Sequence, residues 1–71
     1  MKSILDIRDL LKRYGAFIYT GDRLGDLMFM EDEIRELYKS NVIDSKEFQS
    51  ALLILRQEAR KEEERKMKQN N

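Results

Sequence analysis

The chain of 71 residues contains no cysteine, no histidine, no proline and no tryptophan. Because disulfides need cysteine and structural zinc sites need cysteine or histidine, neither can reinforce the fold. The nucleophile–base pairs and metal clusters of most enzymes draw on the same residues. The sequence also has no P-loop and no GxGxxG motif. We therefore predict a protein that is not an enzyme and that holds no cofactor and no metal.

Long hydrophobic runs are missing too. The longest unbroken one, residues 51–55, is only five residues long, whereas a membrane-spanning helix needs roughly 20 apolar residues. The first residues do not resemble a signal peptide, and a chain without thiols suits a reducing compartment. We expect no contact with a membrane and a cytoplasmic location.

The length leaves room for one small domain, because a second core needs roughly 50 residues of its own. A chain of this size buries only about 60% of the surface that it exposes when unfolded, so its stability is expected to be marginal. We predict a single domain over residues 1–61. Residues 62–71 are almost all charged or polar, and we expect them to form a helical tail that frays.

Residues 4–14 have the spacing of an amphipathic helix. Ser3 is a suitable N-cap, with Asp6 in the position of a capping box, and Gly15 can take the left-handed conformation that ends a helix. The apolar stripe consists of Ile4, Ile7, Leu10, Leu11 and Tyr14.

Residues 16–21 follow a different pattern. Phe17, Ile18, Tyr19 and Thr20 are aromatic or β-branched, which favours an extended backbone. Since no partner strand is available, we predict an extended connector in which alternate side chains are buried.

A second helix is expected over residues 23–39, with Asp22 as its N-cap and with Asn41 in the left-handed conformation beyond its end. Its apolar face consists of Leu24, Leu27, Met30, Ile34, Leu37 and Tyr38. Three amphipathic helices with short connections predict an all-α fold. The expected architecture is an antiparallel three-helix bundle with the extended connector between its first and second helices.

The third helix has the clearest start signal. Asp44 and Glu47 form a capping-box pattern, and Ile43 and Phe48 have the spacing of a hydrophobic staple. The inward stripe consists of Phe48, Ala51, Leu52, Leu55 and Ala59.

Charges of the two signs balance, with 14 basic and 14 acidic residues, so any electrostatic function depends on local segregation. Residues 8–23 carry four basic and two acidic side chains, interleaved with aromatic rings. Basic groups that neutralise phosphates beside rings on which bases stack are the ingredients of single-strand binding. The candidate nucleic-acid-binding residues are Arg8, Lys12, Arg13, Tyr14, Tyr19 and Arg23.

The same residues also have a purely structural interpretation. Tyr14 continues the apolar stripe of the first helix, and Phe17 is a candidate to fill the core. The basic side chains would then form an ordinary solvated face, as charged segments usually do.

Some apolar residues lie off the three stripes. Phe29 is placed among acidic residues that would repel phosphate, and Leu53 and Leu5 likewise fall outside the stripes of their helices. If such residues form one patch, a protein contact is the natural explanation. The alternative function is therefore a helical protein-interaction module, which can include self-association.

Ordered identities along the chain resemble a known family. Residues 4–23, Ile-Leu-Asp-Ile-Arg-Asp-Leu-Leu-Lys-Arg-Tyr-Gly-Ala-Phe-Ile-Tyr-Thr-Gly-Asp-Arg, are followed by Asp26-Leu-Met and Glu33-Ile-Arg-Glu-Leu-Tyr. This pattern resembles the YqgQ-like proteins of Gram-positive bacteria over about residues 3–60. The resemblance implies a compact three-helix bundle in a cytosolic protein. It also implies binding of single-stranded DNA or RNA as the leading suggested role, with no catalytic residues to transfer.

Overall fold

The computed structural model describes residues 1–69, which form three helices. They are α1 (Ile4–Arg13), α2 (Arg23–Lys39) and α3 (Ser45–Gln69). No β-strand occurs among the described residues, so the predicted all-α class is confirmed. None of these helices combines the length and the hydrophobicity that crossing a lipid bilayer requires.

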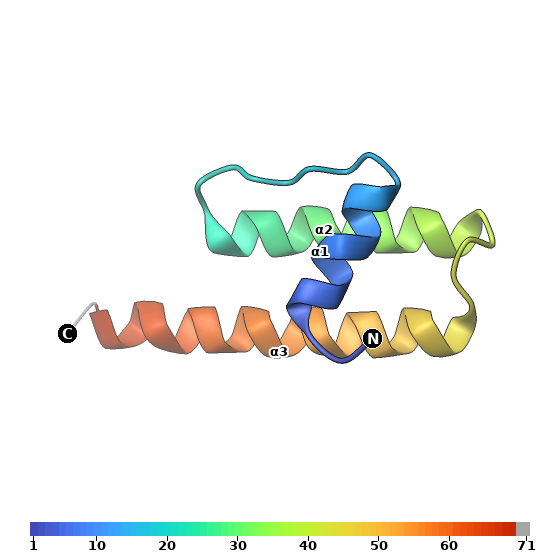
Figure 1. The fold of residues 1–71 in the computed structure, drawn as a ribbon. Coiled ribbons are helices and arrows are strands. Elements are labelled where there is room, and N and C mark those ends of the chain that lie inside the picture. Colours follow the sequence, from blue (N-terminus) through green and yellow to red (C-terminus); the bar gives the residue numbers. More distant parts are fainter. Residues whose placement is uncertain (70–71) are drawn as a thin grey trace.

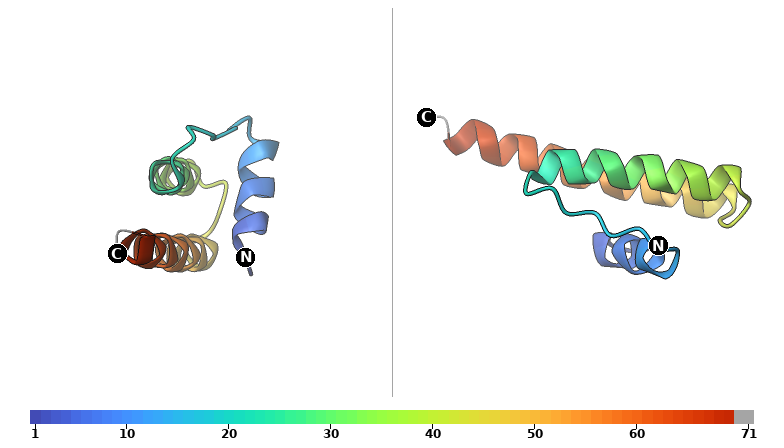
Figure 2. Two further views of the ribbon diagram at one scale, coloured as in Figure 1. Left: turned by 90° about the vertical axis from the view of Figure 1, so that its left-hand side faces the viewer. Right: turned by 90° about the horizontal axis from the view of Figure 1, so that it is seen from above.

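The helices form a three-helix bundle in which α2 and α3 lie side by side and run in opposite directions, while α1 lies across them (Figures 1 and 2). The antiparallel arrangement predicted for all three helices thus holds for α2 and α3 only. The connector explains the difference. Its eight residues, 15–22, span roughly 25 Å when extended, about the length of the 17-residue α2. The connector therefore runs back along α2, and α1 packs across the hairpin.

The helix starts follow the predicted capping signals. The Asp6 carboxylate accepts hydrogen bonds from the backbone N–H groups of Lys2 (2.8 Å) and Ser3 (3.2 Å). The Asp22 carboxylate caps α2 by accepting from the Gly25 N–H at 3.1 Å. At the start of α3, the Asp44 carboxylate accepts from the Glu47 N–H at 2.7 Å. These carboxylates accept hydrogen bonds from backbone N–H groups at the starts of the helices, where such groups otherwise have no partner within the helix.

The ends of the first two helices also match the predictions. Gly15 has a φ of 83° directly after the C-cap of α1. Asn41 has a φ of 61° after α2, the left-handed conformation that asparagine tolerates better than most residues.

The core lies where α1 meets the α2–α3 hairpin. All the predicted stripes contribute to it, and its buried apolar residues are Ile7, Leu10, Leu11, Leu27, Met30, Ile34, Ile43, Ala51 and Leu55. Burial of these side chains is the main stabilising contribution in a chain that has no cross-links.

The structural interpretation of the two aromatic residues near the connector is wrong. Tyr14 is 57% exposed and Phe17 is 76% exposed. Ala16 and Ile18 pack against the core instead, so alternate burial along the connector is confirmed, but with Phe17 on the outside. The rings are therefore free to contact a ligand.

Helix α3 continues to Gln69, beyond residue 62 where fraying is predicted. Ion pairs occur along this part, between Arg65 and Glu62 (2.9 Å) and between Lys66 and Asp22 at the start of α2 (3.4 Å). Such exposed pairs contribute little to stability, and fraying of the tail stays a prediction. Residues 70–71 of the predicted tail lie outside the described residues.

Candidate nucleic-acid interface

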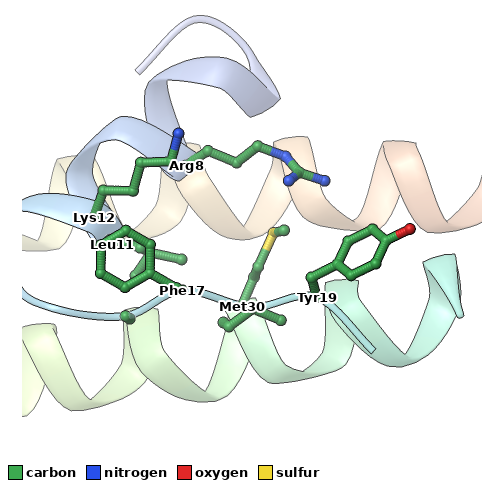
Figure 3. A pocket seen from close by; sticks show the side chains of 8 residues that line it. Arg8, Leu11, Lys12, Phe17, Tyr19 and Met30 are labelled. Carbon is green, nitrogen blue, oxygen red and sulfur yellow. The ribbon is translucent and has the colours of Figure 1, made fainter. Parts of the chain in front are cut away.

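A groove of about 270 Å³ opens between α1, the connector and α2 (Figure 3). Its lining combines cations, exposed rings and an apolar floor, from Arg8, Leu11, Lys12, Ala16, Phe17, Ile18, Tyr19 and Met30. The helical spacing of α1 brings Arg8, Leu11 and Lys12 to one side, while the extended backbone directs alternate connector residues outward. The groove is therefore a direct product of the connector's conformation.

The aromatic wall of the groove is unusually exposed. Phe17 and Tyr19 are 76% and 87% exposed, and Figure 3 shows their rings on either side of the Met30 thioether. Large exposed rings that lie close together mark binding sites more often than isolated ones do. They can stack on a planar ligand without disturbing the core.

The cationic edge is formed by Arg8 and Lys12. Neither side chain forms an ion pair with a carboxylate within residues 1–69. In Figure 3 the Arg8 side chain extends above Met30 toward Tyr19. Both cations are therefore available to phosphate groups beside the rings.

A buried carboxylate fixes the end of the connector. Asp26, in the first turn of α2, is only 5% exposed. It accepts hydrogen bonds from the Thr20 N–H at 2.7 Å and from the Thr20 hydroxyl at 2.6 Å. These bonds hold the pKa of Asp26 below its ordinary value of 3.8, and the nearby Arg8 lowers it further. We call this arrangement the Thr20–Asp26 clamp.

Gly25 leaves space for the turn that joins Thr20 to Asp26. A Cβ at this position would lie 3.1 Å from an Asp22 carboxylate oxygen and 3.6 Å from the Thr20 hydroxyl. A residue without a side chain therefore allows the end of the connector to sit tightly against the start of α2.

The structure brings together only part of the predicted site. Arg8, Lys12 and Tyr19 line the groove. Arg13 and Tyr14, at the end of α1, are exposed but do not line it.

Arg23 is placed elsewhere, because its guanidinium contacts Glu58 of α3 at 3.4 Å. Together they line a separate hollow with Lys61, Glu62 and Arg65. This pairing joins residues 35 positions apart in the sequence, so the local charge pattern gives no sign of it.

Phe17 is the exposed aromatic residue of the groove that the set of candidate site residues omits. Phe17 could have been identified from the alternation of side chains along an extended segment, in which residues two apart point to the same side. If Tyr19 faces the ligand, Phe17 must face the same way.

The fold and the groove define a small all-α protein with a basic and aromatic surface groove. The chain belongs to the YqgQ-like family, whose model matches residues 1–61. A protein of Bacillus subtilis (strain 168), called uncharacterized protein YqgQ, is 38% identical to it over 58 residues, which cover 82% of each chain. The predicted resemblance is confirmed, and the name of that relative assigns no activity to it.

Proposed function

We propose that the protein is a non-enzymatic module that binds single-stranded DNA or RNA with little base specificity through the groove between α1 and the connector. The observation that carries the proposal is the position of two cations, Arg8 and Lys12, which have no carboxylate partner within residues 1–69, beside two exposed rings, Phe17 and Tyr19. A single strand offers phosphates and free base faces together, whereas a duplex conceals the base faces.

The function requires no cofactor and no metal, because binding here rests on stacking and phosphate contacts alone. A cytoplasmic location belongs to the same proposal, since the chain without thiols suits a reducing compartment. Its balanced net charge means that affinity has to come from the local groove and not from the overall field of the molecule.

Salt dependence gives a quantitative test. Each phosphate contact on a single strand contributes about −0.7 to the slope of log K against log salt concentration. The two groove cations therefore predict a slope of about −1.4, and a further contact from Arg13 would bring it to about −2.1. Fluorescence anisotropy with labelled oligo-dT and oligo-U at several salt concentrations measures this slope.

The variants Arg8→Gln and Lys12→Ala should each weaken binding and flatten the slope by about 0.7. Arg60→Gln, an exposed cation of α3 outside the groove, is the matched control and should leave both unchanged. The absence of binding at about 100 μM protein in low salt, the weak end of non-specific affinity, would contradict the proposal.

A second candidate function is protein interaction through the α2–α3 seam. A groove of about 260 Å³ there has an apolar floor and a mainly acidic rim, and is lined by Leu24, Leu27, Met28, Glu31, Asp32, Leu55, Arg56, Ala59 and Glu63. Its lining includes no residue of α1 or of the connector. The three carboxylates would repel phosphate, so a basic amphipathic helix of a partner protein suits this groove best.

Titration with a labelled synthetic Leu–Lys amphipathic helix and its Leu–Glu counterpart tests this candidate. The Leu–Lys helix should bind more tightly, and Asp32→Lys should abolish that preference while Asp9→Lys, an equal change of charge on α1, should not. Equal binding of the two helices would exclude a charge-selected partner. Self-association through the exposed Phe29 and Leu53 would instead appear as concentration-dependent sedimentation that Phe29→Ser reduces.

A further inference from the structure

The spacing of the two connector rings sets the size of what can enter between them. Phe17 and Tyr19 leave the same side of an extended backbone. Residues two apart on such a backbone are separated by roughly 6.6 Å. One planar base with a ring stacked on each face needs about twice the 3.4 Å rise of stacked bases. In Figure 3 the two rings point away from each other, so they have to turn about their side-chain bonds until both stand parallel over the backbone. In that arrangement the spacing accommodates one base between the rings and leaves no room for two.

The rest of the groove suits a single base as well. Met30 forms the floor between the rings, and Arg8 passes above it (Figure 3). Because the Met30 side chain is only 1% exposed, it supports the floor from below, whereas the Arg8 guanidinium can offer several N–H donors to the oxygens of a phosphate beside the base. The volume of about 270 Å³ is slightly below the roughly 300–1,000 Å³ of pockets that hold drug-sized ligands.

Both ends of the segment that carries the rings are fixed. At one end the Ala16 N–H donates to the Leu11 carbonyl oxygen at 2.9 Å. At the other end the Thr20–Asp26 clamp ties the connector to α2. The backbone is therefore ordered before the ligand arrives, while the exposed rings can still turn about their side-chain bonds. Such pre-organisation lowers the entropic cost of binding.

We propose that the groove is a single-base site, in which one unpaired base of a strand is held between Phe17 and Tyr19 while Arg8 and Lys12 contact the flanking phosphates. This inference rests on the proposed function and makes it more specific. It means that the protein recognises one accessible base in a strand and not a run of stacked bases. A base within a duplex cannot enter, because its neighbours in the stack already cover both of its faces.

Strands with bases removed provide the experiment. Anisotropy compares a labelled dT octamer with an abasic octamer that has the same phosphates, and with an octamer that keeps one central thymine. The abasic strand should bind roughly 5–150-fold more weakly, the effect of about 1–3 kcal/mol of stacking per base. The strand with one thymine should recover the affinity of the dT octamer to within a few-fold.

The variants assign this effect to the two rings. Phe17→Ala and Tyr19→Ala should each reduce the difference between the one-thymine and abasic strands to a few-fold, with an unchanged salt slope. Phe29→Ala, which removes an exposed ring of α2 outside the groove, should preserve the difference. Circular dichroism verifies that each variant is folded.

The possible failures are distinct. If affinity rises with every thymine restored, or if the abasic strand binds as well as the dT octamer, the single-base site is overturned while strand binding stands. A difference that survives both Phe17→Ala and Tyr19→Ala also overturns it. If no octamer binds at all, the proposed function itself fails.

Discussion

Met30→Ala is expected to lower the free energy of unfolding by about 2–5 kcal/mol, the usual cost of truncating a buried methionine to alanine. The Met30 side chain is 1% exposed and lies among the largest fully buried side chains. A chain of 71 residues has a total stability of only about 4–11 kcal/mol, at 0.05–0.15 kcal/mol per residue. The variant should therefore lose a large share of its stability, with a fall of roughly 8–40 °C in melting temperature.

Met28→Ala is a closely matched control, because it makes the same change two residues away on the same helix. The Met28 side chain is 70% exposed, so its truncation should change stability by no more than about 0.5 kcal/mol. Thermal and urea unfolding followed by circular dichroism measure both variants. Similar melting temperatures for the two would show that the inward face of α2 is assigned wrongly.

Asp26→Asn is expected to weaken the fold and the proposed strand binding together. The Asp26 carboxylate is buried and accepts both hydrogen bonds of the Thr20–Asp26 clamp. Both bonds end on the same oxygen, Oδ1, so an asparagine can still accept them, but without the negative charge and with an NH2 group, whose two donors need partners, in place of the second oxygen. The weakened clamp should lower the melting temperature by several degrees and leave Tyr19 less well positioned.

The direction of the change in strand affinity shows whether Asp26→Asn acts through the clamp or only through the loss of a negative charge. Removal of a negative charge near Arg8 would by itself strengthen phosphate binding, whereas a weakened clamp reduces it. Anisotropy with oligo-dT should therefore show weaker binding by Asp26→Asn, and Thr20→Val should act in the same direction. Asp9→Asn, which removes an exposed acid of α1, should not weaken binding. Tighter binding by Asp26→Asn would show that the clamp does not position the site.

The pH dependence of stability follows from the same hydrogen bonds. They hold the pKa of Asp26 in the folded protein below its ordinary value of 3.8. Its contribution to stability is therefore present above the ordinary pKa and is lost as the pH falls through the lower folded pKa. The difference in unfolding free energy between the wild-type protein and Asp26→Asn should be constant between about pH 5 and 7 and should shrink in more acidic solution. A constant difference down to pH 2 would contradict the assignment.

The site depends on a division of roles between the helices and the connector. The α2–α3 hairpin supplies a rigid support, α1 supplies the cations, and the connector supplies the rings. Binding residues on a loop that a scaffold holds in place are a common arrangement. Binding can therefore be altered without loss of stability at the exposed Tyr19, whereas a change at Asp26 alters both together.

Most of the fold could be predicted from the sequence, because the deciding interactions are local. The capping carboxylates Asp6, Asp22 and Asp44 lie three residues from the positions that they pair with, and the helical stripes repeat within a few residues. Gly15 and Asn41 end helices because of backbone preferences that need no distant partner. The extended connector also follows from its own β-branched and aromatic residues.

The candidate site was only partly predictable. Arg8, Lys12 and Tyr19 could be chosen because charge and aromatic content are visible in the sequence, and all three line the groove. Which connector residues face the core could not be predicted from the sequence, since Phe17 and Ile18 have similar hydrophobicity. Only contact with the core decides that Ile18 packs inward while Phe17 faces solvent.

The sequence by itself determined the helices, their caps and their inward faces, all of which depend on neighbours within about one turn. The tertiary structure alone decided that α1 crosses the hairpin, that Arg23 pairs with Glu58, and that Asp26 is buried beneath Thr20. The first two depend on how segments far apart along the chain pack together, and the third depends on how the connector folds back onto the start of α2. Packing of this kind depends on how whole surfaces fit together, and this fit cannot be inferred from a local pattern of residues.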